Sequence, residues 1–274
     1  MVLALATLGC GRLAPDASDA GDSDAAPTDA AVADAGPDVD PNAPPLGTIV
    51  AQELQAWTMS GTSYRPFVLA WFSPSTTVTT GGTCIPTHPT AQCGYPPTCT
   101  FAWPTANAGN LTVAGGMFGS GVDVPQWDVS SLPYDFDGKT KYQGFTAGDV
   151  LTATGTGAEV PAFTAQVTVP ANITLLTPKL PFDEPSGQDL TFTWSGGESG
   201  DHVSIFFDNE APIQADCTFD ATAGTGTIPH EALAGVTGQV NVSIMVVRDA
   251  KTWVGGYPID FQMQRTTNIQ ITFQ

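Results

Sequence analysis

The sequence predicts an all-β protein with two tandem antiparallel β-sandwich domains after a disordered N-terminal tether. Charged residues make up only 13% of the chain, whereas 29 glycines and 23 prolines interrupt it. Between these breaks, short apolar runs alternate with period 2, as strands do. The segment 11–45 contains no aromatic residue, and no run of 18 apolar residues occurs, so we expect no membrane-spanning helix.

Residues 11–45 form an acidic segment rich in Asp, Ala and Pro. The segment holds eight Asp and one Arg, so it contributes −7 to the net charge of −19 and leaves −12 for the remainder. Low hydrophobicity and like charge prevent it from burying enough apolar surface to offset the entropy of ordering. We therefore expect a flexible tether whose ends lie about 30–35 Å apart.

The chain begins with "MVLALATLGC", an apolar run that ends in Gly9 and Cys10. This resembles the end of a bacterial lipoprotein signal peptide, which implies that residues 1–9 are removed and that residues 10–45 are lipid anchor and tether. In such proteins the cysteine is diacylated, so Cys10 is the predicted lipidation site. The run lacks basic residues, which indicates a start codon further upstream. The alternative is that residues 1–9 form a core strand and that Cys10 is an ordinary thiol.

The first predicted domain spans residues 46–170 and includes a cysteine-containing loop. The expected strands are 67–73, 110–116, 148–157 and 163–169. The run 67–73 is apolar on both faces, as in a central strand, and the run 163–169 is apolar on one face.

The second predicted domain spans residues 171–274 and contains seven short strands in about a hundred residues. They are 173–177, 189–194, 202–209, 213–220, 239–249, 257–264 and 268–273, with one helical turn within 228–236. This number of strands resembles immunoglobulin and fibronectin III domains, and Trp194 would be the buried anchor of an early strand. The Cys–Trp–Cys spacing of true immunoglobulin domains is absent.

The tether at 8–45 together with the last hundred residues resembles uncharacterised Gram-negative lipoproteins that are plentiful in myxobacteria. The resemblance implies an outer-membrane location, at the periplasmic face or the cell surface, and no particular activity. Gly11, rather than Asp, directly follows the anchor cysteine and is compatible with that location.

Three cysteines, Cys84, Cys93 and Cys99, lie close together in one loop. In an oxidising compartment a local disulfide is expected, and all three pairings are open. With His88 they offer four zinc-type ligands, but the spacing matches no structural zinc signature. Cys217 alternates with apolar residues and is predicted to be a buried free thiol, with a bridge to the remaining loop cysteine as the alternative.

Charge and motifs argue against several functions. The acidic chain has no Lys/Arg cluster, which disfavours nucleic acid as a partner. No nucleophile, zinc-protease or phosphate-loop motif is present, so we expect no cofactor, no metal and no enzymatic activity. Asp135 and Asp137 form a fragment of a calcium loop and are expected in a turn. Glu198 and Asp201 are likewise expected to be solvated turn residues.

Six tryptophans suggest a role in binding. Trp71 and Trp194 are expected in the core, whereas Trp103, Trp127 and Trp253 lie in loop-like contexts where they could stack on a sugar. The sequence therefore predicts a membrane-anchored lipoprotein that acts as a non-catalytic binding or surface-structural module. The alternatives are a carbohydrate-binding lipoprotein and an extracytoplasmic hydrolase of unrecognised type. The expected partners are the membrane, through the lipid anchor, and a polysaccharide or another surface protein.

Overall fold

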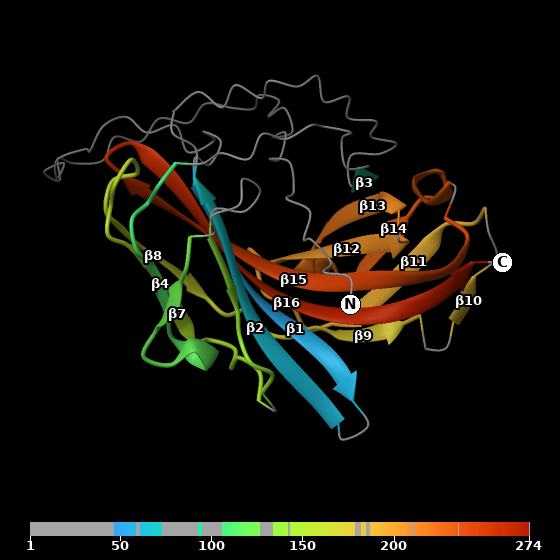
Figure 1. The fold of residues 1–274 in the computed structure, drawn as a ribbon. Coiled ribbons are helices and arrows are strands. Elements are labelled where there is room, and N and C mark those ends of the chain that lie inside the picture. Colours follow the sequence, from blue (N-terminus) through green and yellow to red (C-terminus); the bar gives the residue numbers. More distant parts are fainter. Residues whose placement is uncertain are drawn as a thin grey trace, which may run out of the picture. The chain divides into compact units, whose positions relative to one another are not determined.

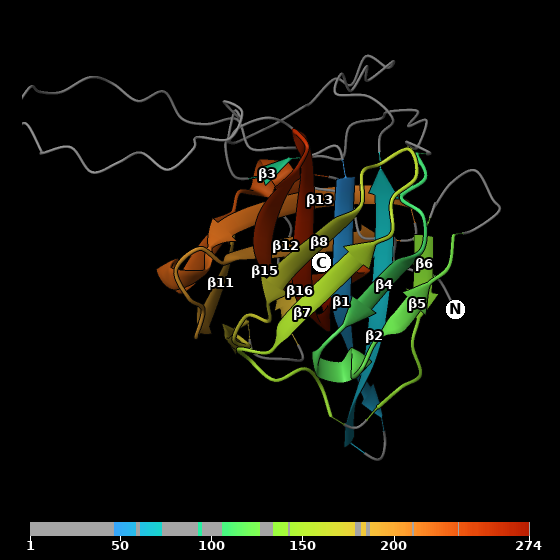
Figure 2. The same ribbon diagram turned by 90° about the vertical axis from the view of Figure 1, so that its left-hand side faces the viewer.

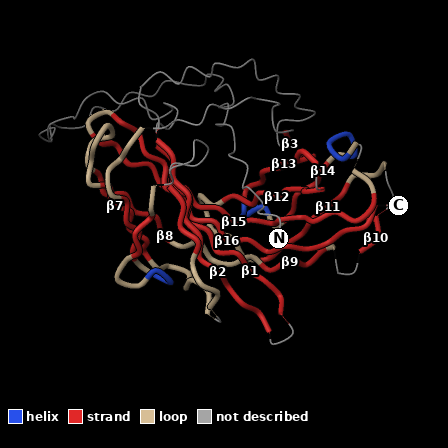
Figure 3. Tube along the Cα trace, in the orientation of Figure 1, coloured by secondary structure: helices blue, strands red, loops and turns tan. Residues whose placement is uncertain are grey.

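The computed structural model describes residues 47–58, 61–72, 93–94, 106–126, 134–141, 143–178, 182–184, 187–209, 211–234 and 236–273. Most of these residues lie in strands, and loops and turns account for nearly all the rest (Figure 3), which confirms the all-β prediction. The helices among them are three short 3₁₀ segments: η1 (Gly116–Phe118), η2 (Ala221–Ala223) and η3 (His230–Leu233).

The largest element is a nine-stranded sheet with the order β3-β13-β12-β15-β16-β1-β2-β6, with β10 paired to the end of β16 (Figure 1). Its strands are β1 (Gly47–Thr58), β2 (Gly61–Phe72), β3 (Cys93–Gly94), β6 (Tyr134–Asp137), β10 (Phe182–Glu184), β12 (His202–Asn209), β13 (Ala211–Asp220), β15 (Gly238–Val254) and β16 (Tyr257–Phe273). β1 and β10 pair with β16 in parallel, and the other pairs are antiparallel.

Two smaller antiparallel sheets pack on the same face of this sheet, which we call the first face. The four-stranded sheet contains β4 (Leu111–Ala114), β5 (Val122–Val124), β7 (Val150–Gly155) and β8 (Phe163–Thr168). It lies across β1 and β2 (Figure 2). The three-stranded sheet contains β9 (Thr174–Thr177), β11 (Leu190–Ser195) and β14 (Thr225–Ile228). Each small sheet therefore closes its own apolar core against the large one.

The β15–β16 hairpin joins the two cores. Its 17-residue strands pair in register along their whole length and turn at Gly255 and Gly256, both of which have positive φ. Alternation places the odd-numbered residues of β16 on the first face. Those from Ile259 to Met263 belong to the core under the four-stranded sheet, and those from Ile269 to Phe273 belong to the core under the three-stranded sheet.

The large sheet crosses the domain boundary that the sequence suggested at residue 170. β1, β2 and β6 come from the range 46–170, and β12, β13, β15 and β16 come from 171–274, yet all pair in one sheet. Residues 45–274 accordingly form one compact unit. The physical reason is that β16 pairs with β15 on one side and with β1 on the other. Its long run of alternating apolar residues therefore contributes to both apolar cores.

Most strands predicted from period-2 alternation are present, including those at 110–116, 148–157, 163–169 and 202–209. The two strands expected at 257–264 and 268–273 are one continuous strand, β16. The expected turn at Asp135 and Asp137 is wrong, because these residues lie in β6 and pair with β2.

The large sheet also has a second face, which is turned away from both smaller sheets. We define it by the outward residues of β1, β2, β12, β15 and β16. Many of them are buried: Thr48, Val50, Gln52, Phe67, Leu69, Trp71, Ser204, Phe206, Met245, Val247, Asp260, Gln264 and Thr266. The strand run 67–72 is therefore apolar and buried on both faces, as the sequence predicted for a central strand.

Candidate functional site

A disulfide joins two strands that lie far apart in sequence. Cys93 on β3 and Cys217 on β13 are bonded across a separation of 124 residues, and both are buried in the core under the three-stranded sheet. The prediction of a free thiol at Cys217 is therefore wrong, and Cys93 has a distant partner instead of a local one. The structure shows the alternative, a bridge from Cys217 to one of the loop cysteines, because the large sheet brings β3 beside β13.

Several predicted site residues lie outside the described ranges: Cys10, Cys84, Cys99, Trp103 and Trp127. Trp253 is described. It lies half-buried near the turn of the β15–β16 hairpin, opposite Pro258. The two tryptophans expected in the core are both buried. Trp194 donates a hydrogen bond from its indole nitrogen to the carbonyl oxygen of Ala221 at 2.8 Å.

Of the two acids expected to be solvated turn residues, Glu198 is exposed and Asp201 is not. Asp201 is buried and receives two hydrogen bonds from the Arg248 guanidinium, at 2.6 and 2.9 Å. The same guanidinium donates to Glu198 at 2.6 Å. These charge-assisted hydrogen bonds, together with the charge of the Asp201 carboxylate, raise the pKa of Arg248 above its ordinary value. Asp201 is therefore a buried ion-pair partner rather than a solvated turn residue, whereas Glu198 is exposed, as expected.

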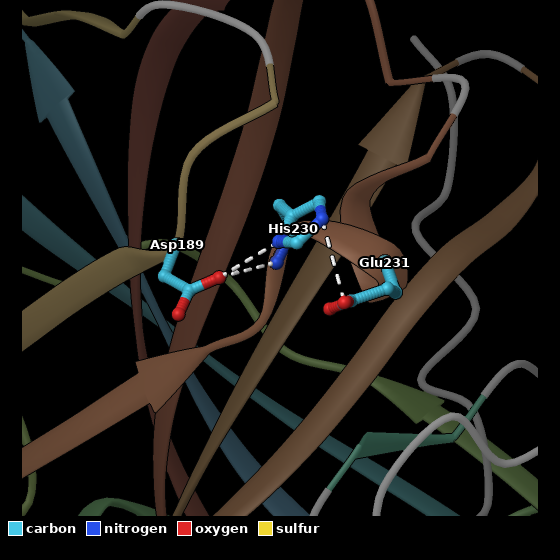
Figure 4. Close-up of side chains that lie close together, drawn as sticks. All are labelled: Asp189, His230 and Glu231. Atoms are coloured by element: carbon cyan, nitrogen blue, oxygen red, sulfur yellow. Dashed lines mark hydrogen bonds and ion pairs between the residues drawn. The ribbon is translucent and has the colours of Figure 1, made fainter.

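Asp189, His230 and Glu231 bring three metal-type ligands together at the surface (Figure 4). Asp189 precedes β11, and the other two open η3. The Asp189 carboxylate accepts a hydrogen bond from the backbone N–H of His230 at 2.9 Å and lies 3.0 Å from Nδ1 of its ring. Nε2 of the same ring lies 3.4 Å from the Glu231 carboxylate.

The hydrogen bonds within this exposed trio determine its charge state and what it could bind. The hydrogen bonds from His230 hold the pKa of Asp189 below its ordinary value, so Asp189 is a carboxylate at neutral pH. The two ring nitrogens of His230 face different carboxylates, so a cation bound by all three residues would displace one of these contacts. The arrangement fastens η3 to the start of β11. Sequence reasoning missed it because the residues lie 41 positions apart.

A row of polar side chains follows β16 on the second face. Gln264 donates to Gln262 at 3.3 Å, and Gln262 donates to a carboxylate oxygen of Asp260 at 2.9 Å. Asp260 and Gln264 are each 7% exposed, and one oxygen of each has no hydrogen-bond partner among the described residues. Burial raises the pKa of Asp260 to about 6. We call these three residues the polar row.

Comparison of the chain with known protein families and curated proteins finds no match: no protein-family model matches the chain, and no curated protein is significantly similar to it. None of the helical turns within the described ranges has the length and apolar character needed to cross a bilayer.

Proposed function

We propose that this chain is an exported lipoprotein of the outer membrane whose β body is a non-catalytic binding or surface-structural module. The buried Cys93–Cys217 disulfide is the observation that carries the proposal. Stable structural disulfides form in the periplasm and outside the cell rather than in a reducing cytosol. In this proposal Cys10 carries the acyl chains, and residues 11–45 separate the membrane from the body.

The charge of the chain supports the same role. A net charge of −19 repels other polyanions, so a neutral polysaccharide or a surface protein is a better partner than nucleic acid. Arg248 and Arg265 are committed to carboxylates within the body, so neither cation is available to attract an anionic ligand.

Metabolic labelling tests the anchor. Wild-type protein expressed in a Gram-negative host is expected to incorporate an alkyne-labelled palmitate and to fractionate with the outer membrane. Cys10→Ala is expected to lose both properties, whereas Cys99→Ala, the matched control, keeps them. Label retained by Cys10→Ala, or a mature chain that still begins at Met1, would overturn the proposal.

Carbohydrate binding is a second candidate, and the placement of Trp253 favours it. The side chain is half-exposed at the end of a long hairpin, where one ring face could stack on a sugar. A glycan array with wild type and Trp253→Ala tests this directly. Neutral-glycan signals that disappear in the variant would support it, and equal signals from the two proteins would refute it.

A further inference from the structure

The ring of His230 lies between two carboxylates, and each of them faces a different ring nitrogen (Figure 4). On one side, Asp189 accepts the backbone N–H of His230 at 2.9 Å and lies 3.0 Å from Nδ1. On the other side, Nε2 lies 3.4 Å from a carboxylate oxygen of Glu231. The three side chains are between 48% and 60% exposed, so a dissolved ion can reach them.

Asp189 decides which ring nitrogen carries the proton. Hydrogen bonds from the backbone and the ring of His230 hold the pKa of Asp189 below its ordinary value, so it is a carboxylate at neutral pH. An ionised carboxylate only accepts hydrogen bonds, and Nδ1 must therefore be the donor of the contact at 3.0 Å. A neutral imidazole carries one proton, which leaves a lone pair on Nε2.

The contact between Nε2 and Glu231 therefore joins two acceptors when the ring is neutral. Their separation of 3.4 Å is longer than an ordinary N–H···O hydrogen bond, which spans about 2.7–3.2 Å. It does fit two neighbouring ligands of one metal ion. In a tetrahedral zinc site, bonds of about 2.0–2.2 Å place neighbouring ligand atoms about 3.3–3.5 Å apart.

The contact on the Nδ1 side matches the surroundings of a metal-binding histidine. Such a histidine usually donates its other ring N–H to a carboxylate or carbonyl oxygen, which fixes the tautomer and the orientation of the ring. Asp189 accepts in this way from His230. A nitrogen ligand beside a carboxylate suits zinc and similar transition metals, whereas calcium and magnesium take oxygen ligands.

We propose that His230 and Glu231 form a surface site for a zinc-type divalent cation, with Asp189 as the positioning residue that holds the His230 ring. The cation takes the lone pairs of Nε2 and of a Glu231 oxygen, so both contacts of Asp189 stay in place. Two protein ligands leave two of the four tetrahedral positions to water. The sequence showed no metal motif here because Asp189 lies 41 positions from His230. This proposal does not depend on the lipid anchor or on the function of the body.

Isothermal titration with zinc chloride tests the ligands in the full chain, prepared without a histidine tag. His230→Gln and Glu231→Gln are each expected to lose one zinc equivalent relative to wild type. His202→Gln is the matched control, because His202 also lies beside a carboxylate, that of Asp249 at 3.6 Å, and it should bind as wild type does. The difference between variants is the measurement, since Cys84, His88 and Cys99 also offer zinc ligands. Equal binding by wild type and His230→Gln would overturn the proposal.

Nitrogen-15 NMR of the histidine rings gives a second measurement that does not depend on the number of bound ions. The chain has three histidines, so the His→Gln variants assign their signals. At neutral pH the His230 ring is expected to carry its proton on Nδ1, and zinc is expected to shift its Nε2 signal. Calcium chloride should leave that signal unchanged. A ring that is protonated on both nitrogens and does not respond to zinc would show that a proton, and no metal, joins Nε2 to Glu231.

Asp189→Asn tests the positioning role, because the amide oxygen still accepts a hydrogen bond but carries no charge. The affinity for zinc is expected to fall about 10–100-fold, as for other outer partners of metal-binding histidines. In the same variant, the NMR signals should show that the Nδ1-protonated tautomer of His230 has lost population. An unchanged affinity together with an unchanged tautomer would overturn the role of Asp189.

Discussion

Glu53 on β1 and Arg265 on β16 form a buried ion pair. Along β16, Arg265 lies between the residues of the core under the four-stranded sheet and those of the core under the three-stranded sheet. Their side chains meet at 3.1 Å, and Arg265 also donates to the carbonyl oxygens of Phe145 at 2.8 Å and Pro170 at 3.2 Å. The backbone N–H of Phe145 donates to Glu53 in return. Each charge is therefore matched by fixed partners, as buried ions require.

Arg265→Met is expected to lower the free energy of unfolding by about 3–5 kcal/mol, because it leaves the Glu53 carboxylate buried without a cation. Urea unfolding measures the loss. The double variant with Glu53→Met removes both charges and should recover most of it.

Arg65→Met is the matched control for this prediction, because Arg65 pairs with Asp137 at a partly exposed position. Exposed pairs contribute about 0–1 kcal/mol, so the control should change stability little. Equal losses in the two single variants would contradict the assigned role of the buried pair.

Asp260→Asn is expected to change how stability depends on pH. The pKa of Asp260 is about 6, raised chiefly by burial, and the Asp249 carboxylate adds to the rise. Between about pH 4 and 6 the folded state therefore holds more protons than the unfolded state, so wild-type stability falls as pH rises through this window. The variant lacks this fall. In urea titrations, the free energy of unfolding of Asp260→Asn relative to that of wild type should rise by about 3 kcal/mol between pH 4 and pH 7. A difference that does not vary with pH would contradict the burial of this carboxyl group.

The double variant Cys93→Ala, Cys217→Ala is expected to lose about 4–5 kcal/mol of stability, because the bond closes a loop of more than a hundred residues. Wild type unfolded in a reducing agent should show the same loss. The pairing itself is checked by peptide mapping without reduction. A map that joins Cys93 to Cys84 or Cys99 would refute it.

Trp194→Phe is expected to cost about 1–3 kcal/mol, since the carbonyl of Ala221 loses its buried donor. Trp253→Phe, at the half-exposed end of the hairpin, should stay within about 0.5 kcal/mol of wild type. Thermal unfolding of the two variants side by side makes the comparison, and equal shifts in their Tm would show that the buried hydrogen bond contributes nothing.

The strands that the sequence predicted best have strict apolar alternation between clear breaks. Phe163, Ala165 and Val167 all face the core of the four-stranded sheet, and Leu190, Phe192 and Trp194 face the other core. β1 was not predicted, because Gln52, Glu53 and Gln55 interrupt its alternation. Gln52 and Glu53 are buried all the same, since Thr266 and Arg265 on the neighbouring strand give them polar partners.

The sequence did not predict most of the relationships between distant segments, and it offered the bridge from Cys217 to a loop cysteine only as an alternative. The trio at Asp189, the disulfide at Cys217 and the Asp201–Arg248 pair each join segments 41 or more residues apart. Local pattern identifies strands and their buried sides, but it does not identify which strands become neighbours. For that reason the single large sheet was predicted as two separate sandwiches.

The parallel pairing of β1 with β16 has a consequence for how the protein is made. Glu53 and Arg265 lie 212 positions apart, and β1 pairs along most of its length with a strand close to the C-terminal end of the chain. The central sheet therefore cannot be completed until the ribosome has synthesised β16, long after β1. Such late closure would keep the nascent chain open for translocation, as the proposed export requires. A premature stop before residue 257 would remove β16 and leave both cores without their shared wall.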